Sequence, residues 1–149
     1  MTNYKMNRPR LSHRGVLAAV WLAGFCLSFS IVYFLHLTHH INSDQNYALA
    51  ISQLKTAFVP FLLIVLTFYF SDKRHEPLRE PNGAFVVAFL VSAFWNIVVA
   101  SPLIWVMAGK DTIEAAIRNI QTTSNVLSFI VGPAIGFYFG ARHVEQGRE

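Results

Sequence analysis

Four long apolar segments, separated by short charged ones, dominate this sequence. They run from Gly15 to Leu37, Ala50 to Phe70, Ala84 to Ala108 and Gln121 to Gly140. Each has the roughly 20 residues that a helix needs to cross a hydrocarbon layer about 30 Å thick. Lipid offers the backbone no hydrogen-bond partner, so such segments must be helical. The sequence therefore predicts an all-α polytopic membrane protein, with four transmembrane helices in a single domain.

Composition agrees with this class. Hydrophobic residues make up 54% of the 149 residues and charged residues 13%, whereas soluble domains carry about 25% charged residues. The first segment follows a basic leader, but it is too long for a signal peptide and no small-x-small cleavage motif follows it. We therefore expect it to be a retained anchor.

The basic residues predict the direction of insertion. Nine of the 12 Lys and Arg side chains lie in the two terminal tails and in the connection between the second and third segments. The other two connections, residues 38–49 and 109–120, hold only Lys110 and Arg118. Loops rich in Lys and Arg stay in the cytoplasm. Both termini are therefore expected to be cytoplasmic, and the short loops favour a bacterial inner (plasma) membrane.

The two halves of the chain align with each other after a shift of 69 residues. This shift places Phe68-Tyr69-Phe70 on Phe137-Tyr138-Phe139. One interpretation is a pair of tandem two-helix hairpins, related by a pseudo-two-fold axis along the membrane normal. The alternative is that both triplets are aromatic belts at the membrane interface, which any membrane span can carry.

Small residues recur every four positions in the last two segments. Glycines one turn apart let another helix backbone approach closely. The fourth segment has Gly132, Gly136 and Gly140, and the third has Ala84, Ala88, Ser92, Asn96 and Ala100. We expect these stripes to pack the third and fourth helices together, or alternatively to join copies of the chain into a homo-oligomer.

Polar residues inside the apolar segments are costly in lipid, so they are candidates for function. Gln53, Lys55 and Thr56 lie in the outer part of the second segment, and Asn125 lies in that of the fourth. One interpretation is a water-filled vestibule, with Lys55 attracting anions. The other is that Lys55 extends to the outer headgroups. Asn96, near the centre of the third segment, is a further pore candidate that could contact a substrate; the alternative, which we expect, is a hydrogen bond between helices.

The outer loops carry two further patterns. His36, His40 and Asp44 would share one helical face if the first helix continued beyond Leu37, which makes them weak candidates for a metal site or an external pH sensor. An interfacial polar rim is the simpler interpretation. Asp111-Thr112-Ile113-Glu114 has the pattern of a capping box. The isoleucines that follow, Ile113, Ile117 and Ile120, predict a short amphipathic helix lying on the outer leaflet.

No catalytic residues and no cofactor are predicted. The spans contain no Asp or Glu, and the chain has no nucleophile set, no nucleotide-binding glycine loop and no cysteine pair. The charged Ser71–Gly83 connection is a candidate docking surface for a cytosolic protein. Apart from that partner we expect the lipid bilayer and other copies of the chain, and no nucleic acid. The sequence predicts a non-enzymatic membrane subunit, an oligomeric anchor, sensor or assembly component; the alternative is a small channel or carrier.

Overall fold

The computed structural model describes residues 13–71 and 82–145, with side chains for residues 13–70 and 83–138. These residues form four α-helices: α1 (His13–Leu37), α2 (Asp44–Ser71), α3 (Asn82–Met107) and α4 (Ile113–Glu145). The all-helical prediction is confirmed. The tails and most of the Ser71–Gly83 connection lie outside the described residues.

The helices α1, α2 and α3 are long and apolar enough to cross a membrane, which indicates an integral membrane protein. Helix α4 does not meet the same criterion within the described residues. Its first half carries polar side chains at most positions between Arg118 and Asn125, and this lowers its mean hydropathy. It nevertheless packs along both α2 and α3 as a full member of the bundle.

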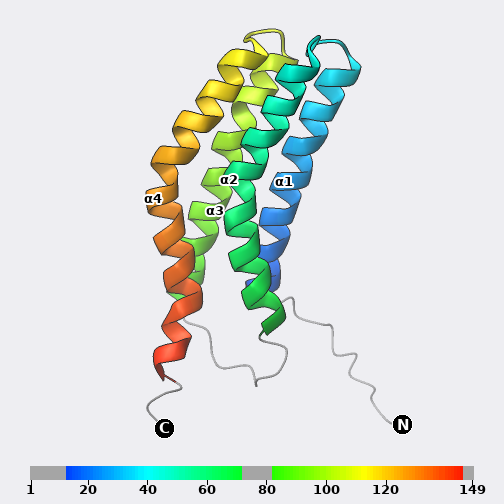
Figure 1. The fold of residues 1–149 in the computed structure, drawn as a ribbon. Helices are drawn as coiled ribbons and strands as arrows, with labels where there is room; N and C mark the ends of the chain where they lie inside the picture. Colours follow the sequence, from blue (N-terminus) through cyan, green and yellow to red (C-terminus); the bar gives the residue numbers. More distant parts are fainter. Residues whose placement is uncertain (1–12, 72–81, 146–149) are drawn as a thin grey trace, which may run out of the picture.

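The four helices form an up-and-down bundle in which the two short loops lie at one end and the N- and C-terminal ends of the helical region at the other (Figure 1). We call the end with residues 38–43 and 108–112 the loop end. Helix α1 contacts α2 and α3, and α4 also contacts α2 and α3. The order around the bundle is therefore α1, α2, α4, α3.

This order contradicts the expected pseudo-two-fold axis. A two-fold axis along the bundle would place α1 diagonally opposite α3, because the axis would exchange them. Instead α1 and α3 lie side by side and run in the same direction, as do α2 and α4. The chain does contain two consecutive hairpins, but they are displaced sideways relative to each other.

Helices α1 and α3 end in the same way, with one residue in the left-handed conformation. His39 has φ 60° and Gly109 has φ 68°. After α1 the amide of His40 donates to Leu35 O (3.0 Å), and after α3 the amide of Lys110 donates to Trp105 O (3.0 Å). These bonds satisfy the last carbonyls of each helix in a Schellman motif. They turn the chain at once, so each loop is short.

An aromatic cluster fills the centre of the bundle. The Trp21 ring centroid lies 5.2 Å from that of Phe61 and 6.2 Å from that of Trp95, while Phe61 and Trp95 are 5.0 Å apart. Trp21 and Trp95 are both 0% exposed. Edge-on and tilted ring pairs at these separations are attractive beyond the area they bury. This cluster joins α1, α2 and α3.

The expected amphipathic surface helix is not present. Ile113, Ile117 and Ile120 are buried and belong to the first turns of α4, which continues without a break. Their apolar face packs against the bundle, which buries it more completely than the surface of a bilayer would. The cap also differs from the expected box: the Thr112 hydroxyl accepts from the Ala115 amide (3.3 Å), while Glu114 bonds Asn46 of α2.

Candidate functional site

The glycine stripe of α4 does not pack against α3. A Cβ atom added to Gly132 would meet only Phe61 of α2, at 3.9 Å, and one added to Gly136 would meet nothing within 4 Å. Gly140 lies in α4, but its surroundings are not described. The expectation that this stripe joins α3 and α4 within the chain is therefore wrong, and Gly136 leaves an open notch on the outside of the bundle.

The small-residue stripe of α3 instead receives α1. Ala88, Ser92 and Ala100 are buried, and Ala84 is half-buried. The Trp21 indole donates from Nε1 to Ser92 Oγ (2.9 Å), and the Ser92 hydroxyl donates onward to Ala88 O (2.7 Å). The stripe therefore serves contact between two parallel helices that the sequence did not pair.

Asn96 also faces α1, but it does not form the expected bond between helices. Its amide nitrogen donates to Ser92 O within α3 (2.7 Å), and its buried Oδ1 has no hydrogen-bond partner in the structure. A Cβ atom added to Gly24 would overlap this amide group. Gly24 is thus the glycine that allows a close helix approach. Gly24 lies nine residues after Gly15, so no four-residue spacing of glycines points to it.

The polar candidates of α2 and α4 point away from the bundle. Lys55, Thr56 and Asn125 are exposed, and Gln53 is half-buried. They do not converge with Asn96, which lies on the other side of the bundle between α1 and α3. Within the described part of one chain, these residues do not line a shared vestibule. Arg118, Gln121 and Thr122 of α4 are exposed too.

We call seven of the exposed polar side chains of α2 and α4 the polar face. Its members are Ser52, Lys55 and Thr56 on α2, and Arg118, Gln121, Thr122 and Asn125 on α4. Neither amide side chain of the α4 part has a hydrogen-bond partner among the described residues. Thr56 only returns a bond to its own helix, donating to Ser52 O at 3.0 Å.

The two halves of the polar face lie at the same height in the bundle. Asn46 of α2 bonds Glu114 of α4 near the loop end, and Phe61 lies against Gly132 further down. Because α2 and α4 run in the same direction between these two contacts, Thr56 lies level with Asn125 or nearly so. Thr56 and Asn125 are each about three turns into their helices, roughly 18 Å from the loop end.

The opposite side of the bundle has no such polar band. Between Val86 and Trp105, the exposed side chains of α3 are all apolar. On α1 the exposed side chains include Leu22, Leu27, Tyr33 and Phe34. The bundle is therefore asymmetric: its α1–α3 side suits lipid, and its α2–α4 side is polar from the loop end to about mid-height.

The histidines near the loop end do not form the expected face. Helix α1 ends at Leu37, so His40 and Asp44 are not in register with His36. His36 stacks on Tyr47 with ring centroids 4.3 Å apart, while His39 and His40 are exposed. Among residues 13–71 and 82–145, no group of three His, Cys, Asp or Glu side chains could hold a metal ion.

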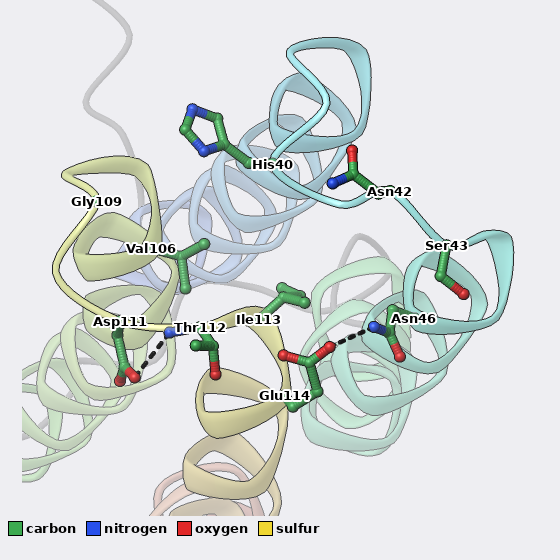
Figure 2. Close-up of a pocket in the computed structure, with 10 residues that line it drawn as sticks. All are labelled: His40, Asn42, Ser43, Asn46, Val106, Gly109, Asp111, Thr112, Ile113 and Glu114. Atoms are coloured by element: carbon green, nitrogen blue, oxygen red, sulfur yellow. Dashed lines mark hydrogen bonds between the residues drawn. The ribbon is translucent and has the colours of Figure 1, made fainter.

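A polar cleft of about 330 Å³ lies where the two loops meet (Figure 2). His40 and Ser43 line it from the first loop, and Asp111, Thr112 and Glu114 line it from the second loop and the start of α4. The Asn46–Glu114 bond crosses it and joins the two hairpins. The role of the cleft is therefore structural, because the residues that line it hold the two hairpins together.

Comparisons with known proteins leave the site to be interpreted from its own chemistry. The chain matches no protein-family model, and no similar protein was found among curated proteins or among solved structures.

Proposed function

We propose that this chain is a non-enzymatic subunit of a membrane complex, an oligomeric anchor, sensor or assembly component. In this proposal all four helices cross the membrane, because α4 packs along α2 and α3 and would be immersed with them. Both termini are cytoplasmic and the loop end faces outward, in accord with the distribution of Lys and Arg.

One observation carries the proposal: the polar face is exposed on a bundle that is otherwise suited to lipid. Helices of 28 and 33 residues exceed the hydrocarbon thickness of about 30 Å by roughly one to two turns at each end. Asn125 and Thr56 would therefore lie well inside the hydrocarbon layer. Amide and hydroxyl groups that face lipid there are unfavourable, so the polar face requires a protein partner or water to cover it.

Intact mass measurement in lipid nanodiscs tests the proposal. We expect the chain to be released as a complex, either with copies of itself or with another protein. A monomer without any bound protein, obtained from a nanodisc preparation made directly from cell membranes, would contradict it. The cytosolic partner expected at the Ser71–Gly83 connection would appear as an additional mass in the same spectrum.

A small channel or carrier is the second candidate, and the exposed Lys55 favours it. If copies of the chain surround a water-filled path with their polar faces, a Lys ammonium at this depth would attract anions. Lys55→Met is then expected to reduce anion flux into liposomes. Absence of flux with the unaltered protein would reject this candidate while leaving the subunit proposal intact.

A further inference from the structure

We propose that the polar face is the contact between two copies of this chain, related by a two-fold axis along the membrane normal. The inference deepens the proposed function and rests on it. Such an axis keeps every residue at its own height and keeps both copies in the same orientation. It places α2 of one copy against α4 of the other, running in the same direction.

The heights of the exposed residues suit this pairing. Thr56 lies close to the level of Asn125, and Ser52 lies close to that of Gln121. The two-fold axis would bring each hydroxyl opposite an amide of the second copy. Because an amide group both donates and accepts hydrogen bonds, hydroxyl–amide pairs are complementary without a further partner. The pairing therefore gives hydrogen-bond partners to hydroxyl and amide groups for which lipid offers none.

The apolar part below the polar face is also complementary. Leu63 of α2 is 60% exposed, and it lies near the level of Gly132, which faces Phe61, two residues before Leu63 on α2. The open notch at Gly136 lies a further turn down α4. A projecting leucine and a glycine notch at similar heights let two helices approach closely. The glycine stripe is thus available for contact between copies.

Disulfide cross-linking between two differently tagged chains tests the interface. The single cysteine is first removed by Cys26→Ser. One chain then carries Thr56→Cys and the other Asn125→Cys, so that only a contact between copies can join them. The matched control pairs Leu27→Cys with Ile97→Cys, two exposed positions near one level on the α1–α3 side. We expect the first pair to form a disulfide-linked mixed dimer. We expect the control pair to form none.

The remaining outcomes separate this inference from the proposed function. Cross-linking only at Leu27→Cys and Ile97→Cys, or a complex with a different protein over the polar face, would overturn the two-fold contact and leave the subunit proposal standing. Labelling of Gln121→Cys by a membrane-impermeant thiol reagent, without any cross-link, would instead indicate that water covers the face. An uncomplexed monomer would overturn both.

Discussion

Ser92 is the residue on which the contact between α1 and α3 most depends, because its hydroxyl accepts from Trp21 and donates to Ala88 O. Ser92→Ala would leave the buried indole N–H without a partner, at a cost of about 1–2 kcal/mol. Unfolding by denaturing detergent in mixed micelles measures this change. Trp21→Phe in the Ser92→Ala background should add less than Trp21→Phe alone, and strictly additive losses would contradict the bond.

Gly24 and Asn96 form the closest approach between these helices, and they predict a specific rescue. Gly24→Ala would place a methyl group in the space of the Asn96 amide, which is held by its bond to Ser92 O. Overpacking of this kind costs about 1–3 kcal/mol. Asn96→Ala should recover part of that loss in the double variant, measured by the same detergent titration. An equal loss in both backgrounds would show that the two residues do not meet.

His39 and Gly109 occupy equivalent left-handed positions with different side chains, so they predict opposite effects. A non-glycine residue in this conformation is unfavourable by about 1–2 kcal/mol. His39→Gly should therefore stabilise the protein by about 0.5–1 kcal/mol, and Gly109→Ala should destabilise it by about 1 kcal/mol. Thermal unfolding in detergent compares them. Shifts of the same sign would contradict the two equivalent turns.

At the scale of helices, the polar half of α4 is the element whose behaviour depends most on its surroundings. Gln121→Leu with Asn125→Leu would make this helix more apolar without altering a bond that the structure contains. If a partner covers the polar face, the double change should weaken the complex and leave the monomer fold as stable or more stable. Intact mass and detergent titration separate the two effects. A less stable monomer would instead show that these two amide side chains stabilise the fold of the single chain.

The sequence predicted the helices well and their faces poorly. Length and apolar composition indicate a membrane helix, so α1 and α3 were found within two residues of their ends, whereas α2 begins six residues before the predicted segment. Four-residue spacing identified two small-residue stripes, but spacing does not reveal which neighbour a stripe meets. The α3 stripe meets α1, and the α4 stripe is left largely open. The isoleucines of the α4 start were assigned to a bilayer surface because amphipathicity does not distinguish lipid from a neighbouring helix.

At the scale of the whole molecule, the positions of the loops allow a test of orientation. Both loops lie at one end of the bundle (Figure 1), so Asn42→Cys and Lys110→Cys must be on the same side of the membrane. In a Cys26→Ser background and in intact cells, we expect both to react with a membrane-impermeant maleimide. Reaction of neither, with full reaction after lysis, would reverse the proposed orientation. Reaction of one alone would contradict the bundle itself.

The bond from Trp21 to Ser92 spans 71 residues of sequence, and this has a consequence for biogenesis. When the first hairpin leaves the translocon, its buried indole donor has no acceptor until the third helix has been synthesised. A nascent chain stopped after α2 should therefore persist as an incomplete intermediate, recognisable to insertases and membrane proteases. Maturation of this protein is in that sense a late event, completed when the second hairpin inserts beside the first.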